Sequence, residues 1–115
     1  MFDSIGVDIE EIDRFTRKKF FDNKSFYEQI FTNNEIKYCL SKIDPYPHFA
    51  VRFCAKEAAI KALSDKKILL KNIEVILKED KPILKIFNEI IGLVSLSHSK
   101  NHAIAFVMIQ KNLNI

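Results

Sequence analysis

The strongest helix signal in the chain is DPYPHFAVRFCAKEAAIKAL, residues 44–63. Asp44 can cap a helix, and Pro45 suits the first helical position because no helical hydrogen bond needs its missing N–H. Apolar residues then recur at helical spacing, and alanines supply helix propensity. The pattern predicts one long helix over residues 45–63. Its many alanines predict that another element packs closely against it.

The residues before this segment predict a strand and a short capped helix. Residues 4–10 alternate between apolar and polar side chains, which predicts a half-buried strand with its polar side, including Asp8, facing outward. The sequence TNNE at residues 32–35 has capping-box spacing and predicts a helix that runs to about Leu40. The apolar side of the strand would consist of Ile5, Val7 and Ile9.

The residues after the long helix predict an antiparallel sheet. Residues 73–86 contain two short runs typical of strands, separated by a polar turn. A short helix is expected over residues 87–91, ending at Gly92. Residues 93–98 and 103–109 flank the polar tetrapeptide SKNH, which predicts a hairpin.

Length and composition favour one globular domain. The chain has 115 residues, of which 48% are hydrophobic, with only two Gly and three Pro. We therefore predict a single α+β domain over residues 1–115, in which a small antiparallel sheet packs with one long helix and shorter helices. Cys39 and Cys54 lie in apolar, helix-like surroundings and are expected to be free buried thiols.

We expect neither a secretion signal nor a membrane span in this sequence. Its first residues include acids where a signal peptide has basic residues followed by an apolar run. No apolar run approaches the ~18 residues of a membrane-spanning helix. A soluble, cytoplasmic protein without a membrane partner is expected.

Basic residues gather in two clusters, although the formal net charge is only +3. Such clusters are typical of proteins with anionic partners, but solvated surfaces show them too. They lack the interleaved aromatic residues of a single-strand nucleic-acid binder, so we expect no nucleic acid. A small nucleic-acid-binding module stays as an alternative, which salt-sensitive binding would reveal. The clusters consist of Arg14, Arg17, Lys18, Lys19 and Lys24, and of Lys61, Lys66, Lys67 and Lys71.

Acidic residues occur on the predicted strand and on the predicted long helix. Asp8 and Glu10 share a strand face, where two carboxylates suit Mg²⁺, although a polar outer face gives the same pattern. Glu57 and Lys61 share a helix face. They form either an ordinary surface ion pair or part of a site in which Glu57 binds metal while Lys61 and the adjacent Lys56 bind phosphate.

Two histidines lie near the predicted hairpin, His98 at a strand end and His102 across the turn. A pair of histidines can bind zinc, but neither cysteine has matching spacing. A histidine hydrogen-bonded at the strand end is the competing interpretation.

Three segments resemble the holo-acyl-carrier-protein synthase family. They are IGVDIEEIDRF at residues 5–15, FAVRFCAKEAAIKAL at 49–63 and VSLSHSKNHAIAFVM at 94–108, and they appear in family order. The resemblance implies a 4'-phosphopantetheinyl transferase-like fold. It also implies an Mg²⁺-dependent transfer of 4'-phosphopantetheine from coenzyme A to a serine of an apo acyl carrier protein. Adenosine 3',5'-bisphosphate would be released, and the reaction would serve fatty acid and lipid metabolism.

The resemblance also implies roles for individual residues. Asp8 and Glu57 would be Mg²⁺ ligands, with Glu10 as a possible third. Lys61 would lie beside the coenzyme A phosphates. Glu57, directly or through a metal-bound water, is our own candidate for the base that takes the serine proton. The remaining cofactor-binding residues would be Arg52, Lys56 and His98, and Arg14, Arg17 and Lys18 would face the acidic helix of the carrier protein. The family is typically homotrimeric, with active sites between subunits.

Besides the possible metal ligand Glu10, the chain departs from the family pattern at two places. Residues 64–67 are SDKK where the family often has a Gly-Thr-Gly-like turn, and the region over residues 82–93 is shorter than usual. Lys66 or Lys67 would then replace the backbone contacts to the phosphates. A structural protein that assembles through a Phe-rich surface stays as a third interpretation, which coenzyme A binding would exclude.

Overall fold

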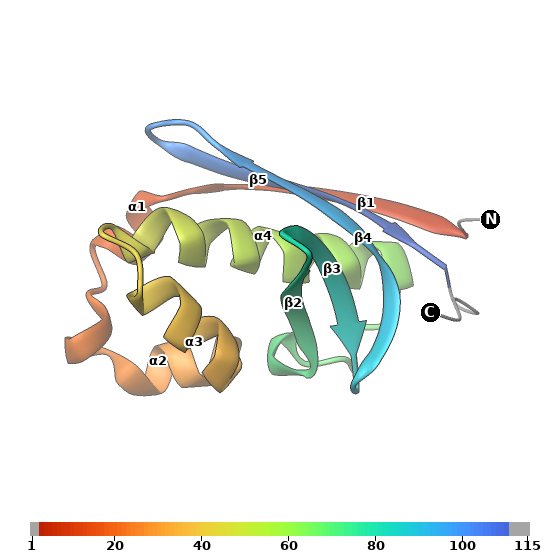
Figure 1. Ribbon diagram of the computed structural model, residues 1–115, viewed down its shortest axis with the longest axis horizontal. Helices are drawn as coiled ribbons and strands as arrows, with labels where there is room; N and C mark the ends of the chain where they lie inside the picture. Colours follow the sequence, from red (N-terminus) through yellow and green to blue (C-terminus); the bar gives the residue numbers. More distant parts are fainter. Residues whose placement is uncertain (1–2, 111–115) are drawn as a thin grey trace.

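A computed structural model describes residues 3–110 and has an α+β architecture (Figure 1). Strand β1 comes first, short helices follow, the long helix α4 lies mid-chain, and four strands complete the fold. The helices are α1 (Asp13–Thr16), α2 (Lys24–Ile30), α3 (Asn33–Leu40) and α4 (Pro45–Leu63), with single 3₁₀ turns at Phe20–Asp22 and Leu70–Asn72. The strands are β1 (Ser4–Glu11), β2 (Ile73–Lys78), β3 (Lys81–Ile86), β4 (Glu89–His98) and β5 (His102–Ile109).

The strands form one antiparallel sheet in the order β1-β5-β4-β3-β2. Strand β1 pairs with β5, so that Ser4 lies opposite Ile109 and Glu11 opposite His102. Helix α4 runs beneath β1, β5 and β4, and α2 and α3 lie on its other side (Figure 1). Among the described helices, none is long and apolar enough to cross a membrane.

The long helix begins and ends at the predicted residues. The Asp44 side chain accepts a hydrogen bond of 3.2 Å from the Tyr46 N–H, and Ser64 ends the helix in the left-handed conformation at φ 53°. Its small side chains are buried, among them Ala58 at 0% exposure. A Cβ added at Gly6 would lie 2.1 Å from the Ala58 carbonyl oxygen, so a larger residue would push β1 off the helix.

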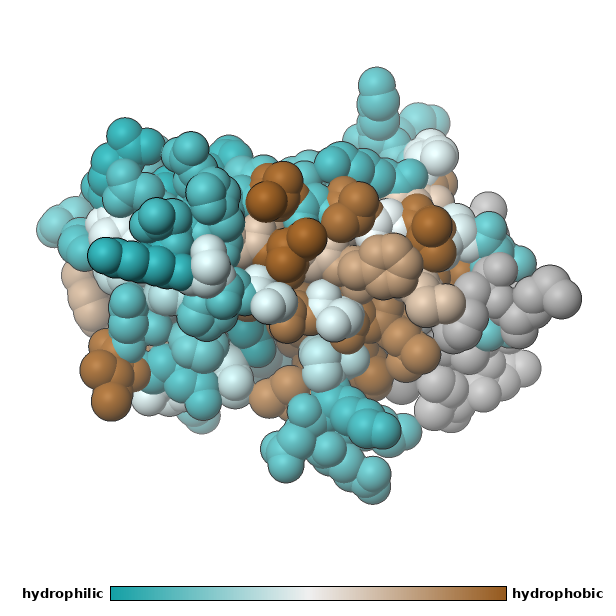
Figure 2. All heavy atoms as spheres, turned by 90° about the horizontal axis from the view of Figure 1, so that it is seen from above, coloured by the Kyte–Doolittle hydropathy of each residue, from teal (hydrophilic) through white to brown (hydrophobic). Residues whose placement is uncertain are grey.

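The apolar side of β1 faces solvent, contrary to the prediction. Ile5, Val7 and Ile9 are 62%, 50% and 60% exposed, while Asp8 and Glu10 lie on the side that faces α4. The reason is Gly6, because only the glycine side of the strand allows the helix to approach this closely. The exposed apolar side chains continue over the neighbouring strands and form the brown area of Figure 2.

The prediction of a short helix over residues 87–91 was also wrong. Phe87 and Asn88 have φ of 50° and 68° and form the two-residue turn between β3 and β4. The hairpin turn at residues 99–102 and the polar turn between β2 and β3 are present as predicted. Cys39 and Cys54 are free and buried, as expected.

The N-terminal basic segment is held against the helical layer by buried aromatic rings. Phe15 is completely buried, and its ring centroid lies 5.5 Å from that of Phe53 on α4. The Tyr27 hydroxyl lies 3.1 Å from the carbonyl oxygen of Phe15 and 2.7 Å from that of Lys18. The backbone around α1 is therefore supported from α2 and α4 and presents its basic side chains in defined places.

Candidate functional site

The acids of β1 and α4 meet at Lys61, in the last turn of α4. The Lys61 ammonium lies 2.9 Å from Asp8 Oδ1 and 3.2 Å from the Val7 carbonyl oxygen. Glu57 lies one turn earlier on the same helix. The hydrogen bond to Asp8 raises the pKa of Lys61, and the charges of Asp8, Glu57 and Glu10 raise it further. The structure thus brings together residues from two elements that the sequence alone leaves unconnected.

Asp8 has one carboxylate oxygen that is buried and unpaired. Its side chain is only 10% exposed, and Oδ2 has no hydrogen-bond partner among the described residues. A buried carboxylate oxygen without a donor is unfavourable unless a cation or a donor reaches it. The orphaned oxygen of Asp8, beside further carboxylates, is therefore a suitable ligand for a hard divalent cation.

Glu10 joins this acidic group to the basic segment of α1. Burial raises the pKa of Glu10, the hydrogen bond from Arg14 opposes that rise, and the charge of Asp8 adds to it. Arg14 Nη1 lies 2.9 Å from Glu10 Oε1. The side chains of Arg14, Glu10, Asp8, Lys61 and Glu57 thus form a continuous group of charges across β1 and α4.

The carboxylates fit Mg²⁺ but do not complete its coordination. Within residues 3–110, no three Asp, Glu, His or Cys side chains lie close enough to form a metal site of their own. Mg²⁺ is commonly bound by one or two carboxylates together with waters and phosphate oxygens. Asp8 and Glu57, with Glu10 nearby, are the residues that would hold it here.

Comparison with known proteins decides which family this arrangement represents. The family model described as the 4'-phosphopantetheinyl transferase superfamily matches residues 4–107. The chain belongs to this superfamily. The transferase is 45% identical to a holo-[acyl-carrier-protein] synthase of Thermodesulfovibrio yellowstonii, over 95% of this chain and 99% of that protein. It is 39% identical to the corresponding synthase of Chlamydia muridarum, over 88% and 89% of the two chains.

Solved structures agree with the family assignment. The transferase is similar to a holo-(acyl-carrier-protein) synthase of Bacillus anthracis in complex with CoA (3',5'-ADP), with 34% identity, a TM-score of 0.82 and coverage of 97% and 99% of the two chains. It is also similar to the Helicobacter pylori synthase in complex with coenzyme A, with 30% identity, a TM-score of 0.77 and coverage of 92% and 99%. The predicted family and fold class are thereby confirmed.

Lys56, which we expected on the cofactor side of the transferase, lies in its interior. The side chains of Lys56 and Glu35 are both 0% exposed, and the ammonium lies 2.7 Å from Glu35 Oε1. It also donates to the carbonyl oxygens of Leu70, at 3.2 Å, and Ile73. Burial lowers the pKa of Lys56, while the charge of Glu35 opposes that shift. No donor of Lys56 faces the surface, so we remove it from the proposed site.

Arg52 and His98 each lie close to a third residue, His48. The Arg52 Nη1 lies 3.3 Å from the His48 carbonyl oxygen, and its Nε is buried without a partner in the described structure. The Arg52 guanidinium also stacks 4.2 Å from the centroid of the Tyr38 ring. The rings of His48 and His98 are 6.3 Å apart. Burial lowers the pKa of His48, and the positive charges of nearby Arg52 and Lys42 lower it further. The positive charge around His48 is therefore carried by Arg52 and Lys42.

The basic side chains of α1 and the residues after it are exposed beside aromatic rings. The Arg14 guanidinium lies 4.6 Å from the Phe53 ring centroid, and the Lys18 ammonium lies 4.3 Å from that of Phe26. Arg17 pairs with Asp13 at 3.2 Å. The sequence showed the charges but gave no indication that aromatic rings lie beneath two of them.

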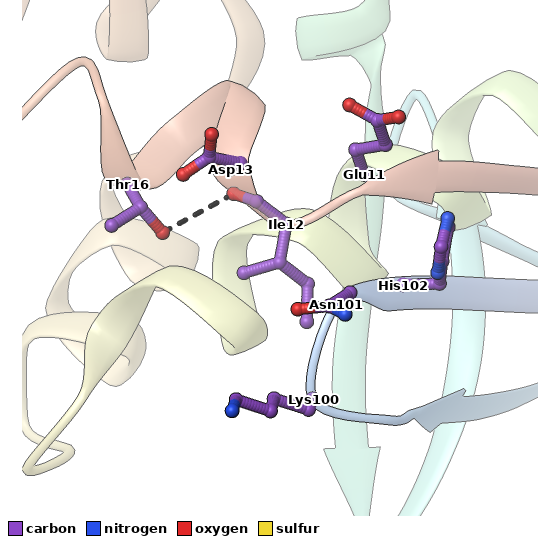
Figure 3. A pocket seen from close by; sticks show the side chains of 7 residues that line it. All are labelled: Glu11, Ile12, Asp13, Thr16, Lys100, Asn101 and His102. Carbon is purple, nitrogen blue, oxygen red and sulfur yellow. Dashed lines mark hydrogen bonds between the residues drawn. The ribbon is translucent and has the colours of Figure 1, made fainter.

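A broad hollow lies at the same end of the molecule, between the end of β1 and the β4–β5 turn (Figure 3). Figure 3 shows Glu11 and His102 on one side of it, and Asp13 and Thr16 on the other, where Thr16 donates to the Ile12 carbonyl oxygen at 3.4 Å. Neither Asp8 nor Glu57 lines it. The proposed metal ligands therefore lie outside this hollow.

Cys54 lies beneath the acidic group and was not expected there. Its thiol is 3.4 Å from the Ala103 carbonyl oxygen. Burial raises the pKa of Cys54 to about 12, and the charges of Asp8 and Glu10 contribute to the rise. The thiol therefore stays protonated at neutral pH and does not act as a nucleophile.

Proposed function

We propose that this transferase moves 4'-phosphopantetheine from coenzyme A to a serine of an apo acyl carrier protein, with Mg²⁺, and releases adenosine 3',5'-bisphosphate. The observation that carries the proposal is the meeting of Asp8, Glu57 and Lys61 at one place on the surface. The relatives named holo-[acyl-carrier-protein] synthase and the solved synthases with bound coenzyme A support it.

Each residue of this group has a task in the reaction. Asp8 and Glu57 would hold Mg²⁺, which would supply positive charge to offset the charge of the coenzyme A diphosphate. The Lys61 ammonium stabilises the charge that develops on the phosphate oxygens. Glu57 accepts the proton of the carrier serine. The serine oxygen bonds to the phosphorus that carries pantetheine, the bond from that phosphorus to the bridging oxygen breaks, and adenosine 3',5'-bisphosphate leaves with the bridging oxygen.

Arg52 and His98 are proposed to bind the nucleotide part of coenzyme A. Their support is the positive group around His48 and the unpartnered Nε of Arg52. Arg52 and Glu57 are five residues apart, which places them roughly 140° apart around the helix. A site shared between two copies of the chain brings both kinds of side chain to one coenzyme A molecule.

The exposed apolar face supports a homotrimer. Six apolar side chains on β1, β4 and β5 are each at least 40% exposed on the outer side of the sheet. Figure 2 shows a brown area on this face with polar side chains along part of its edge, and such an apolar patch is typical of an interface. The six apolar side chains are Ile5, Val7, Ile9, Leu93, Ile104 and Phe106.

Placing a charge in this apolar face should separate the subunits. Phe106→Lys is expected to give a monomer at concentrations at which the unchanged protein is a trimer, because the introduced ammonium would be buried without a partner. Multi-angle light scattering after size-exclusion chromatography measures the mass. Ile43→Lys is the control, since Ile43 is a fully exposed apolar residue that lies outside the face. A trimeric Phe106→Lys protein would contradict the proposed interface.

We propose that the carrier protein binds at the basic side chains of α1 and its neighbours. Arg14 adjoins the acidic group through Glu10, so a carrier bound here has its serine near the reacting phosphate. Arg17 and Lys18 extend the positive surface away from the site. The half-buried ring of Phe26 adds apolar area beside Lys18, which suits an amphipathic acidic helix.

Reversing two charges on this surface should weaken carrier binding and spare coenzyme A binding. For Arg17→Glu/Lys18→Glu we expect the KM for the carrier to rise about tenfold, because like charges then face each other, with little change in the KM for coenzyme A. Steady-state kinetics with each substrate varied in turn measures both values. Lys78→Glu, an exposed change on β2, is the control. An unchanged carrier KM in the double variant would place the carrier elsewhere.

The free buried thiols of Cys39 and Cys54 fit a reducing compartment, and we propose a cytoplasmic location. Cell fractionation tests it, and recovery of the protein with the membrane or outside the cell would contradict it.

The proposed activity is tested by the mass of the carrier. Apo acyl carrier protein is incubated with coenzyme A, Mg²⁺ and the transferase, and the mass of the carrier is then measured by mass spectrometry. We expect the carrier to gain one phosphopantetheine group, adenosine 3',5'-bisphosphate to appear, and a chelator to prevent both. A carrier that keeps its apo mass, while an authentic synthase modifies it in parallel, would refute the proposed function.

A further inference from the structure

The Lys61 ammonium lies at the carboxylate that we assign to the metal. It is 2.9 Å from Asp8 Oδ1, within the range of a direct charge-assisted hydrogen bond. We propose that Lys61 is a tethered cation that competes with the divalent metal for Asp8 until the coenzyme A diphosphate draws the ammonium away. The inference rests on the proposed function and adds a coupling between metal binding and coenzyme A binding.

The two partners differ in their freedom to move. The Asp8 side chain is 10% exposed and projects from a strand that is paired with β5 and packed on α4, whereas the Lys61 side chain is 57% exposed. Lysine carries its charge on a flexible four-carbon stem. When a second cation reaches Asp8, the lysine is therefore the group that moves.

The charges around Asp8 hold the Lys61 ammonium at this carboxylate. Asp8, Glu10 and Glu57 all act on the Lys61 ammonium, and Arg14 pairs with Glu10 alone. The ammonium offsets the repulsion among the carboxylates, but it reaches only Oδ1 and leaves Oδ2 of Asp8 unpaired. Lys61 thus occupies one of the two carboxylate oxygens of Asp8, which is Oδ1. A divalent cation that binds Asp8 must share Oδ1 with the ammonium or displace the ammonium, and the two positive charges repel each other.

Coenzyme A removes this competition. Its diphosphate offers the Lys61 ammonium new negative oxygens, and Asp8 then becomes free for the metal. Because coupling between two ligands is reciprocal, the metal must favour coenzyme A to the same extent. As a consequence, the free enzyme binds the metal weakly, and its complex with coenzyme A binds the metal more tightly.

The inference is tested by Mn²⁺ binding to the full chain, followed by electron paramagnetic resonance, with and without coenzyme A. Without coenzyme A, Lys61→Met is expected to bind Mn²⁺ about fivefold more tightly than the unchanged protein, the factor that corresponds to a strong exposed ion pair. With coenzyme A, the tightening of Mn²⁺ binding should be smaller in Lys61→Met than in the unchanged protein.

Two further variants separate this competition from a general charge effect. Lys78→Met removes an exposed positive charge on β2 that makes no ion pair in the described structure, and it should leave Mn²⁺ affinity almost unchanged. Lys61→Arg keeps the charge and should bind Mn²⁺ no more tightly than the unchanged protein. Mn²⁺ affinity that stays equal or falls in Lys61→Met overturns the inference.

The carrier mass assay keeps this result distinct from the proposed function. If the unchanged protein loads the carrier but Lys61→Met gains no Mn²⁺ affinity, only the proposed competition between Lys61 and the metal is overturned. An unchanged protein that neither binds Mn²⁺ nor loads the carrier overturns both proposals.

Discussion

Asp8→Asn is expected to lower the rate of carrier loading by at least about a hundredfold, a loss of the size seen when one charge-stabilising group is removed from an active site. The amide keeps the shape of the carboxylate but lacks its charge. The variant therefore loses the metal ligand and the ion pair to Lys61 with little change in packing. Glu57→Gln should have a similar effect, because it removes both the second carboxylate and the proposed base. Initial rates of phosphopantetheine transfer at saturating substrates measure both variants.

The control for these variants lies on the same strand. Glu11 is exposed on the opposite side of β1 and points toward the hollow of Figure 3, so Glu11→Gln should retain nearly full activity. Circular dichroism and thermal unfolding establish that all three proteins are folded. Folded Asp8→Asn and Glu57→Gln proteins with full activity would remove the proposed metal site.

Lys56→Met is expected to lower the free energy of unfolding by about 3 to 5 kcal/mol, because it leaves the Glu35 carboxylate charged and unpaired inside the protein. Glu35 is 1% exposed, and its oxygens also accept from the Thr32 and Val75 N–H groups at 2.9 Å each. The pair thus connects α3, α4 and β2. Urea unfolding at a fixed protein concentration, followed by circular dichroism, measures the change.

A double variant shows whether the loss comes from the pair. Glu35→Gln/Lys56→Met should lose less stability than the two single changes added together, since neither partner is then left as an uncompensated charge. Lys37→Met, an exposed change on α3, should alter stability by only a few tenths of a kcal/mol. A loss of coenzyme A affinity in Lys56→Met at unchanged stability would contradict the structural role.

Local signals located most of the secondary structure correctly. The cap at Asp44 and the proline after it predicted the first residue of α4, and the capping box at residues 32–35 predicted the start of α3. Capping depends on side chains within a few residues of the helix end, so the necessary information lies in the segment itself. The three family signatures added the expected activity, and comparison confirmed the family.

The wrong predictions have one cause in common, which is that each depended on a contact between residues far apart in the chain. Alternation placed β1 correctly but could not decide which side the helix covers, because that choice depended on the contact of Gly6 with Ala58. The turn at Phe87 and Asn88 was predicted as a helix, since the pairing of β3 with β4 that requires a turn is not visible in one segment. Lys56 was predicted to bind the cofactor, because its buried partner Glu35 on α3 is not visible in the segment around Lys56.

The sequence by itself determined both ends of α4, the start of α3, most of the strand residues, the β4–β5 hairpin and the family, because each depends on neighbouring residues or on a preserved order of motifs. Only the tertiary structure decided which side of β1 is covered, which lysine is buried and which is exposed, and that Asp8 joins Glu57 at Lys61. These are contacts between residues far apart in the chain. They exist only after the close packing of β1 on α4 has selected one face of each element.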